Sequence, residues 1–454
     1  MIINTDRRVH FIGIGGIGMS GIAEVLITLG FKVSGSDVQE SNNTLKLKKM
    51  GANVYIGHRE ENLDSDIVVY SSAINEKNPE IIKARRLGLP ILRRAEILAD
   101  IMRLKVSIAV AGAHGKTTTT SMLATIFYEN LKDPSYIIGG IVKNLDGHAY
   151  LGKGEYLIAE ADESDGSFLL LNPQISVITN IDDDHLDHYK KSENIDMAFK
   201  SFCERIPFYG CACGNADDPR IMKLFEELKR PMVTYGIESE CDYRAVDIHY
   251  GEITSFSVVL KNNPEKYKVE LHMKGKHNVY NSLGAISAAH QAGLDINDIT
   301  KALSRFSGVG RRAQKIFERG NCQVFDDYGH HPTEIKATID AFKLAYPSKK
   351  ISLIFEPHRY TRTQNSWSSF LTCFDGVTEL FLFPIYAASE EPIEGISSDN
   401  LAEMLNKNGV VSKVITDVQL PEVLTKITDS SDILLVMGAG KLGYTVLGIL
   451  NELS

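Results

Sequence analysis

The chain has 454 residues, 43% of them hydrophobic and 24% charged, which suits a globular protein of two to four domains. Its 49 basic and 58 acidic side chains give a formal net charge of −9, which argues against non-specific binding to nucleic acid or to anionic membranes. The sequence has no stretch of about 18 apolar residues, no apolar leader and no framework spacing among its six cysteines, so we expect a cytoplasmic protein with reduced thiols.

The first hundred residues alternate between strand and helix patterns, which is typical of a parallel sheet covered by helices. Apolar runs predict strands at residues 9–14 and 31–36, and helical patterns cover residues 17–29, 79–87 and 94–104. The helix at 79–87 has Asn78 as its expected N-cap, Pro79 in its first position and Gly88 after its end. A new strand at 107–111 places the first domain boundary near residue 105.

A glycine-rich loop follows the first strand. Gly13, Gly15 and Gly18 have the spacing G-x-G-x-x-G, and Asp37 ends the second strand 19 residues later. Such a loop lets backbone N–H groups and a helix N-terminus approach a diphosphate, as in dinucleotide-binding domains. The motif is only moderately specific, because any ligand that carries a diphosphate can use the same helix terminus.

The rest of the chain predicts two further α/β regions. In the middle, strands are expected at 107–111, 155–160 and 174–181, and alternating patterns at 254–260 and 266–273 indicate an antiparallel hairpin added to a parallel sheet. A helix at 279–291 is followed by a Gly- and Arg-rich segment, 306–313, without a regular element. The last region has strands at 322–328, 351–355, 379–383 and 432–437, separated by helical patterns.

Residues 112–120, GAHGKTTTT, resemble a phosphate-binding loop between a strand and a helix. The full P-loop pattern would need a glycine where the chain has Val110. Backbone N–H groups of the loop would surround phosphate oxygens, Lys116 would reach the terminal phosphates and Thr117 would bind Mg²⁺. The alternative is a purely structural glycine-rich turn, which four consecutive threonines after Gly-Lys disfavour.

Carboxylates gather after two further strands, where open α/β sheets bind ligands. The first cluster is EADESD at 160–165, headed by Glu160, in which we interpret Asp165 as part of a solvated turn. The second is NIDDDHLDH at 180–188, which contains His185. So many carboxylates and imidazoles repel one another unless a cation or hydrogen bonds compensate, and a magnesium-dependent phosphoryl site would supply that cation.

Taken together and in order, these motifs resemble the Mur ligase family over the whole length of the chain. The resemblance rests on HFIGIGGIGMSGIAEVL (10–26), VSGSD (33–37), SSAI (71–74), GAHGKTTTT (112–120), EADESDGSF (160–168), NIDDDHLDHY (180–189), GKHNVYNSLGA (275–285), DDYGHHPTEI (326–335) and PHRYTRT (357–363). It implies an α/β fold of three domains. These would be a Rossmann-like N-terminal domain for a UDP sugar (1–105), a central P-loop ATPase domain with a mixed sheet (106–313) and a Rossmann-like C-terminal domain for an amino acid (314–454).

The resemblance implies an ATP-dependent ligase of peptidoglycan synthesis, nearest to the branch of the family that adds L-alanine. ATP and Mg²⁺ would phosphorylate the lactyl carboxylate of UDP-N-acetylmuramate. The amine of L-alanine would then attack the acyl phosphate, releasing ADP and phosphate. The amine must be neutral to attack, so a basic group near it is expected. The chain would act as a monomer or a homodimer.

The resemblance also assigns residues to these tasks. ATP would be bound by Gly112, His114, Gly115, Lys116, Thr117 and Thr118, with Asn278 and Asn281 at the adenine, Asp327 at the ribose and Arg312 at the phosphates. Magnesium would be held by Thr117, Glu160 and His185, and the UDP part by Gly13, Gly15, Gly18, Asp37 and Ser71. Tyr328, His330, Arg359 and Arg362 would face the amino acid and the muramoyl carboxylate, since arginine binds carboxylates bidentately. The catalytic set would be Lys116, His185, His330, Arg359 and Arg362.

Some positions depart from the family pattern or allow simpler interpretations. Ala113 replaces a usual threonine, Ser389 a glycine and Lys441 an aspartate, and the last two leave the amino-acid specificity open. Arg359 and Arg362 could form surface ion pairs, His331 could cap a helix, and Asn281 could be an ordinary residue of a helix start. Lys200 has about the right distance from His185 for the carbamylated lysine of other members, but the alanine-adding branch does not generally rely on that group.

Three other functions remain as alternatives. A recycling ligase would add a preformed tripeptide to the same UDP sugar, against which the Gly-Ile-Gly-Gly-Ile-Gly-Met opening and Asp-Tyr-Gly-His-His argue. A nicotinamide dehydrogenase would use the G-x-G-x-x-G loop but leaves the P-loop and both acidic clusters unexplained. A nucleotide-driven binding or motor protein would hydrolyse ATP without the UDP sugar or an amino acid.

Overall fold

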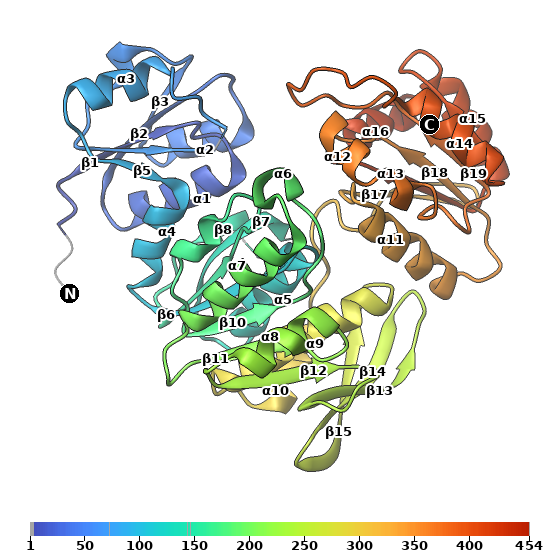
Figure 1. Cartoon of the computed structure of the whole chain (residues 1–454), viewed down its shortest axis with the longest axis horizontal. Coiled ribbons are helices and arrows are strands. Elements are labelled where there is room, and N and C mark those ends of the chain that lie inside the picture. Colours follow the sequence, from blue (N-terminus) through green and yellow to red (C-terminus); the bar gives the residue numbers. More distant parts are fainter. Residues whose placement is uncertain (1–3, 72, 143, 146, 454) are drawn as a thin grey trace. The chain divides into compact units, whose positions relative to one another are not determined.

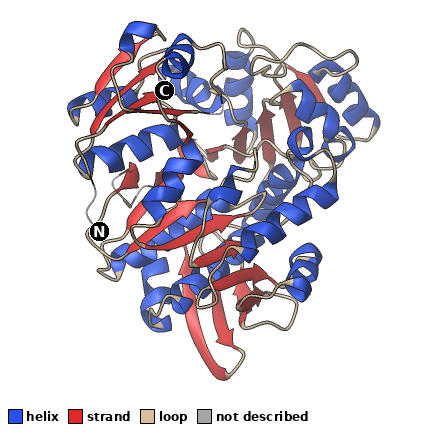
Figure 2. Ribbon diagram, turned by 60° about the vertical axis from the view of Figure 1, so that its left-hand side comes forward, coloured by secondary structure: helices blue, strands red, loops and turns tan. Residues whose placement is uncertain are grey.

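The computed structural model describes residues 4–71, 73–142, 144–145 and 147–453. The chain forms two compact units. The first comprises Met1–Val246, Ser257–Val269 and Tyr280–Phe306, and the second comprises Asp247–Phe256, Glu270–Val279 and Ser307–Ser454. The described residues form three sheets of five, ten and six strands, which follow one another along the sequence (Figure 1). The expected α/β class is confirmed, with helices packed against the strands (Figure 2).

The first sheet contains five parallel strands in the order β3-β2-β1-β4-β5. The strands are β1 (Arg8–Ile12), β2 (Lys32–Asp37), β3 (Asn53–Ile56), β4 (Ile67–Tyr70) and β5 (Ile91–Arg93). Helices α1 (Ile17–Thr28), α2 (Asn42–Lys49), α3 (Pro79–Arg86) and α4 (Arg94–Met102) and the short turn η1 (Glu60–Asn62) connect them. From β1 the chain first adds β2 and β3 on one side of the sheet and then β4 and β5 on the other. Open α/β sheets bind ligands at the strand ends where the order switches in this way, here between β1 and β4.

Local capping signals set the ends of helices as expected. The side chain of Asn78 accepts a hydrogen bond from the Glu80 backbone at 2.9 Å, and Pro79 occupies the first turn of α3. Because proline has no N–H to leave unpaired, this position costs the helix nothing. The predicted start of this helix is therefore confirmed.

The second sheet has ten strands in the order β15-β14-β13-β12-β11-β10-β6-β9-β7-β8. They are β6 (Val106–Ala111), β7 (Ser135–Val142), β8 (Gly147–Tyr150), β9 (Tyr156–Glu160), β10 (Ile175–Ile178), β11 (Cys211–Asn215), β12 (Met232–Gly236), β13 (Tyr243–His249), β14 (Thr254–Leu260) and β15 (Asn263–Leu271). The core pairs are parallel, whereas β7 and β8 are antiparallel, so the sheet is mixed as expected. The helical elements are α5 (Lys116–Glu129), η2 (Ser167–Leu170), α6 (Leu186–Tyr189), α7 (Ser192–Glu204), α8 (Pro219–Glu227), α9 (Lys276–Gln291) and α10 (Ile296–Leu303).

Several strands of this sheet were not predicted from the sequence. Strand β11 has the sequence CACGN, which lacks the β-branched and aromatic residues that signal a strand. All five of its residues are buried, and a side chain added at Gly214 would meet the rings and methyl groups of Phe225 and Ile221. The close approach of α8 therefore selects small residues in this strand, and only the packed structure reveals it.

Helix α1 packs against β8 through a tight contact. A Cβ atom added at Gly21 would lie 2.9 Å from that of Ala149, so no larger residue fits there. Beside it, the Ser20 hydroxyl and the Nε2 atom of His148 lie 3.0 Å apart, with only 5% of the His148 side chain exposed. Burial and the nearby Lys46 charge lower the pKa of His148 to about 4.

We expect His148 to make the protein acid-sensitive. Its pKa in the folded chain lies below the ordinary value of 6.5, so the unfolded chain binds the proton first and stability is lost as the pH falls from about 6.5 to about 4. The loss amounts to as much as about 3 kcal/mol. Denaturant unfolding of a His148→Gln variant between pH 7 and pH 4 should show a correspondingly shallower decline than that of the original protein. Equal declines would contradict the assignment.

The third sheet lies in the second unit and has the order β16-β17-β21-β18-β19-β20. Its strands are β16 (Gln314–Arg319), β17 (Cys322–Asp327), β18 (Ile351–Phe355), β19 (Glu379–Leu382), β20 (Ser412–Val414) and β21 (Ile433–Met437). Helices α11 (Pro332–Ala345), α12 (Tyr360–Asn365), α13 (Trp367–Phe370), α14 (Ser398–Lys407), α15 (Leu420–Ser430) and α16 (Leu442–Glu452) complete it. Strands β16 and β20 were not predicted from the sequence, and β16 pairs antiparallel with β17 at the edge of an otherwise parallel sheet.

Two further expectations concern thiols and membranes. All six cysteines lie among the described residues and are buried free thiols. Within the described ranges, no helix is both long and apolar enough to cross a lipid bilayer.

Candidate active site

Residues 112–115, the loop predicted to bind a nucleotide and called the nucleotide loop below, connect β6 to α5 and include two glycines that the conformation requires. Gly115, directly before α5, has φ +81°, and a Cβ there would lie 2.4 Å from the amide oxygen of Asn281. Gly112 has φ +141°, and a Cβ there would lie 2.0 Å from the hydroxyl of Thr179. Both positions therefore require glycine, and the loop reaches its conformation without a glycine at Val110.

Residues after β10 hold this loop from the side. Asn180 accepts a hydrogen bond from the His114 backbone N–H at 2.9 Å and donates to the His114 carbonyl at 2.9 Å, while the Thr179 hydroxyl donates to the same carbonyl at 2.6 Å. The His114 ring lies 3.1 Å from the Asp182 carboxylate. The loop is thus pre-shaped by the neighbouring strand end rather than by its own sequence alone.

Thr117 and Glu160 meet at the start of α5. The Thr117 hydroxyl lies 3.1 and 3.0 Å from the two carboxylate oxygens of Glu160. The backbone N–H of Gly139, in β7, donates to the same carboxylate at 2.9 Å. The first acidic cluster therefore does bring an oxygen-rich group to the loop, as the sequence predicted. The contribution of Gly139 was not foreseen, because it depends on a strand that the sequence analysis missed.

Lys116 points back into the loop and forms a buried ion pair with Glu163. Its ammonium lies 2.8 Å from each oxygen of the Glu163 carboxylate. Burial favours the neutral amine, but the nearby carboxylates of Glu163, Glu160 and Asp162 outweigh it and raise the pKa of Lys116. Glu163 belongs to the EADESD motif, but no role was predicted for it from the sequence.

Asp162, beside Glu163, pairs with a different cation. Its carboxylate accepts from Arg94, the first residue of α4, at 2.8 Å. Burial alone would raise the pKa of Asp162, but the Arg94 and Lys116 charges hold it at about 2. The same guanidinium fills the space beside Gly18, where a Cβ would lie 2.5 Å from it. Arg94 therefore contacts both the N-terminal glycine loop, at Gly18, and the first acidic cluster (160–165), at Asp162, which lies 68 residues away in the sequence.

His185 is held in an unusual backbone conformation. It directly precedes α6 with φ +58°, a region that non-glycine residues rarely adopt and that often marks functional positions. Its Nε2 atom lies 3.5 Å from Asp184 and 3.8 Å from Glu163. The imidazole is therefore placed beside the carboxylate that pairs with Lys116.

The second acidic cluster does not converge on a single point. The Asp183 carboxylate pairs with Arg220 at 2.7 Å and accepts from the Ser192 hydroxyl at 2.6 Å, whereas Asp182 faces His114. An arginine, a hydroxyl and an imidazole thus lie against these two carboxylates, so protein groups supply part of the compensation that the sequence led us to expect from a cation or from hydrogen bonds. The side chain of Asp187 lies outside the described residues.

Lys200 forms an ion pair with Glu227 on the solvent-facing sides of α7 and α8. Hydrogen bonding to that carboxylate raises the pKa of Lys200. An ammonium that is held charged by a carboxylate is a poor candidate for carbamylation, because that reaction needs the neutral amine. The alanine-adding branch was likewise not expected to rely on a carbamylated lysine.

The other nucleotide residues are placed as follows. Asn281 lies against Gly115 in the first unit, so its amide borders the nucleotide loop. Thr118 is buried in the first turn of α5. Asn278, in the second unit, donates to the Lys274 carbonyl at 2.9 Å and lies 3.0 Å from the His277 ring. Contact of the two asparagines with adenine stays a prediction.

The N-terminal glycine loop closes on the end of β2. The Gly15 N–H donates to the Asp37 carboxylate at 2.8 Å, and the Gly13 N–H donates to the Ser36 carbonyl at 2.8 Å. Ser71, after β4, packs 3.4 Å from the position of a Cβ at Gly13. The five predicted UDP-binding residues are thus grouped around the start of α1. Ser72, in the SSAI motif, lies outside the described residues.

Within the second unit, Arg311 and Arg312 border Tyr328. Their guanidinium carbons lie 5.1 and 5.4 Å from the centre of the tyrosine ring, and Arg312 also approaches Glu334 at 3.5 Å. Asp327 is buried and accepts hydrogen bonds from the backbone of Ala313 and Gly329, both at 2.7 Å. Burial raises the pKa of Asp327 to about 6. Its carboxylate thus fixes the segment that carries the two arginines.

His358 joins the predicted amino-acid residues into one group. Its ring lies 5.9 Å from that of His330 and stacks on Tyr386 at 5.4 Å, and its Nδ1 lies 3.4 Å from Arg362. Burial and the arginine charges lower the pKa of His358 to about 4, so the ring is neutral at pH 7. Its place in the PHRYTRT motif was the available signal, although only the two arginines of that motif were predicted to bind substrate.

Arg359 and His331 also have defined partners. Arg359 pairs with Glu390 at 2.6 Å, and the hydroxyl of Thr361 binds the same carboxylate at 2.7 Å. His331 caps α11 by accepting from the Thr333 backbone at 3.4 Å, which confirms the capping interpretation. Ser389 has φ +71°, a left-handed backbone conformation that favours glycine over other residues.

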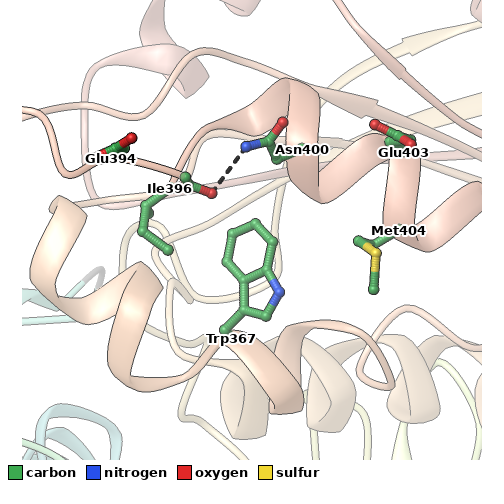
Figure 3. Close-up of a pocket in the computed structure, with 7 residues that line it drawn as sticks. Trp367, Glu394, Ile396, Asn400, Glu403 and Met404 are labelled. Atoms are coloured by element: carbon green, nitrogen blue, oxygen red, sulfur yellow. Dashed lines mark hydrogen bonds between the residues drawn. The ribbon is translucent and has the colours of Figure 1, made fainter.

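A cavity of about 370 Å³ opens elsewhere in the second unit. It is lined by Trp367, Glu394, Gly395, Ile396, Asn400, Glu403 and Met404. Figure 3 shows the Trp367 indole facing Ile396, Asn400 and Met404. None of the predicted site residues lines this cavity, so its apolar walls do not mark the reacting groups.

Three family profiles match successive parts of the chain. They are described as Mur ligase family, catalytic domain, for residues 8–106, Mur ligase middle domain for residues 110–289, and Mur ligase, glutamate ligase domain, for residues 311–440. Together they cover most of the chain and contain every predicted site residue.

Individual relatives align over nearly the full length. Proteins named UDP-N-acetylmuramate–L-alanine ligase from Solidesulfovibrio magneticus and Geobacter sulfurreducens are each 46% identical, covering 97% and 96% of this chain and 96% and 95% of their own. The crystal structure of a UDP-N-acetylmuramate-alanine ligase from Thermotoga maritima superposes with a TM-score of 0.83 at 28% identity, covering 98% of this chain and 99% of that one. A murein peptide ligase from Psychrobacter arcticus gives a TM-score of 0.72 at 25% identity, covering 98% of both chains.

Proposed function

The chain belongs to the Mur ligase family, and from this premise we propose that it joins L-alanine to UDP-N-acetylmuramate at the expense of ATP. The observation that carries the proposal is the nucleotide loop, where Lys116 and the Thr117–Glu160 pair meet at the start of α5. Full-length relatives named for this reaction support it.

The proposed reaction has two chemical steps. The lactyl carboxylate attacks the γ-phosphorus of ATP, and the bond from that phosphorus to the bridging oxygen breaks to release ADP. The alanine amine then attacks the acyl phosphate, and the tetrahedral adduct collapses to an amide with loss of phosphate and a proton. The protein forms no covalent bond in the first step. Its contribution there is to position the reactants and, through Lys116, to neutralise the charge on the phosphoryl group.

Magnesium fits the residues proposed for it. Thr117 and Glu160 supply a hydroxyl and a carboxylate within 3.1 Å of each other at the start of the phosphate-binding helix, which are the hard oxygen donors that Mg²⁺ prefers. We propose His185 as the third group of this site. A bound Mg²⁺ would neutralise charge on the phosphoryl oxygens.

The substrate residues of the second unit suit two carboxylates. Arg359 and Arg362 provide guanidinium groups, and the neutral ring of His358 between Arg362 and Tyr386 keeps that side of the group free of a further positive charge. We propose that Tyr328, His330 and the two arginines bind L-alanine and the muramoyl carboxylate, with Arg312 reaching the ATP phosphates.

The arrangement along the chain follows from the same premise. We propose that residues 1–105 bind the UDP sugar through Gly13, Gly15, Gly18, Asp37 and Ser71. We propose further that 106–313 bind ATP, with Asn278 and Asn281 at the adenine, and that 314–454 bind the amino acid and contribute Asp327 to the ribose. The reaction would take place in the cytoplasm, and the chain would act as a monomer or a homodimer.

The acceptor is the point on which a second candidate function differs. The structural similarity to a murein peptide ligase extends over the full chain, so a tripeptide acceptor is a specific alternative. We expect phosphate release from ATP and Mg²⁺ to require UDP-N-acetylmuramate and to be fastest with L-alanine, because full-length relatives carry that activity in their names. Release with the tripeptide alone would move the assignment to the recycling branch. Release without the UDP sugar would contradict the role of the first domain.

A further inference from the structure

We propose that Glu163 is a positioning residue that occupies Lys116 while the nucleotide loop is empty and is exchanged for phosphate when ATP binds. The inference rests on the proposed function, because it takes Lys116 as the phosphate-binding lysine. It adds a role for a carboxylate of the EADESD motif that the proposed magnesium set does not include.

The Lys116 ammonium already has a hydrogen-bond partner for each of its donors. An ammonium has three N–H donors. In this structure they are directed to the Gly112 carbonyl at 2.8 Å, the Ala113 carbonyl at 3.2 Å and the Glu163 carboxylate at 2.8 Å. No donor is left for a phosphate oxygen, so ATP can engage Lys116 only by replacing one of these partners.

Glu163 is the partner that phosphate replaces. The two carbonyls belong to the loop backbone and are neutral. Burial raises the pKa of Glu163 to about 7 and the Lys116 charge opposes that shift, so the ionised carboxylate is an anion like the phosphate and competes for the same ammonium. Removing a partner from a buried cation without replacement is strongly unfavourable, so the exchange takes place only when the phosphate arrives. The side chains of Lys116 and Glu163 are only 15% and 4% exposed, so water cannot easily take the carboxylate's place.

Hydrogen bonds hold the main chain around Glu163 in place. The Glu163 carbonyl accepts hydrogen bonds from the Tyr189 hydroxyl at 2.6 Å and from the Gly166 N–H at 3.0 Å. The adjacent Asp162 is tied to Arg94. Glu163 is therefore fixed at its backbone, and the flexible four-carbon side chain of Lys116 is the part that swings toward the phosphate.

The expected signature is tighter nucleotide binding when the competing carboxylate is removed. Glu163→Gln should lower the dissociation constant of ATP roughly tenfold, since the state competent to bind no longer has to break the ion pair. Binding is measured by titration calorimetry in EDTA, where no metal can bind and no turnover occurs. Asp162→Asn is the matched control, because it removes an equal charge from the neighbouring residue, which pairs with Arg94 instead.

The outcomes separate the possible roles of Glu163. A larger gain in affinity for Glu163→Gln than for Asp162→Asn supports the exchange. Equal gains would show a charge effect through space and overturn the proposal, and weaker binding would overturn it by making Glu163 part of the binding site. If Glu163→Gln does not fold, Glu163→Asp, which keeps the charge but shortens the reach, should give a smaller gain in the same direction.

The failure of the proposed function would look different. In that case the unmodified protein would not bind ATP, or Lys116→Ala would bind it as tightly as the original chain. ATP binding that depends on Lys116 but is not strengthened by Glu163→Gln would contradict only the exchange. Ligand-free Glu163→Gln should also melt at a lower temperature than the original protein, with a larger increase on adding ATP.

Discussion

Lys116→Ala is expected to lower kcat/KM for ATP-dependent ligation roughly a thousandfold. Lys116 is the first residue of α5 and supplies an ammonium to the nucleotide loop. The N-terminus of the helix also favours phosphate at this place. Without it, the charge that develops on the transferred phosphoryl group loses its nearest protein cation. Coupled measurement of ADP release with saturating UDP-N-acetylmuramate and L-alanine gives the rate.

The control for this variant must separate lost chemistry from lost stability. Lys116→Ala leaves the buried Glu163 carboxylate without its cation, which destabilises the loop as well. Lys116→Arg keeps a positive charge at the same position and should retain a measurable part of the activity while melting close to the original protein. Undiminished activity of a folded Lys116→Ala variant would refute the assignment of the loop.

Glu160→Gln is expected to reduce activity roughly a hundredfold or more and to raise the Mg²⁺ concentration needed for half-maximal rate. The amide keeps an oxygen that can accept the hydrogen bonds from Thr117 and Gly139, so the local structure should persist. What it loses is the negative charge that a hard divalent cation prefers. The measurement is a magnesium titration of the ligation rate at fixed ATP.

Asp165→Asn provides a matched comparison in the same acidic loop. The Asp165 carboxylate accepts a hydrogen bond from the Ser167 backbone at 3.0 Å, which an asparagine oxygen can also accept. Its magnesium dependence should equal that of the original protein. If Asp165→Asn shifted the magnesium titration and Glu160→Gln did not, the proposed metal ligands would have been placed at the wrong end of the loop.

The sequence by itself determined the features that depend on neighbours along the chain. The strand, glycine loop and helix of residues 106–129 and the cap of α3 follow from local backbone preferences, so their residues could be identified directly. The same holds for the placing of Asp37 at the end of β2, where its carboxylate meets Gly15. Apolar and helical patterns located α1, α4 and α9 and several buried strands in the same way, whereas α7, α11 and the helices after residue 397 were not placed.

The partners of the site residues were decided only by the tertiary structure. Lys116 meets Glu163 across 47 positions, and Arg94 meets Asp162 across 68, because the ends of β6, β9 and α4 are brought together by sheet pairing and helix packing. His358 likewise gains its role from Tyr386 and His330 on other segments. Such contacts leave no periodic signal, since which carboxylate reaches which cation depends on register and burial, and these are fixed only when the strands pair.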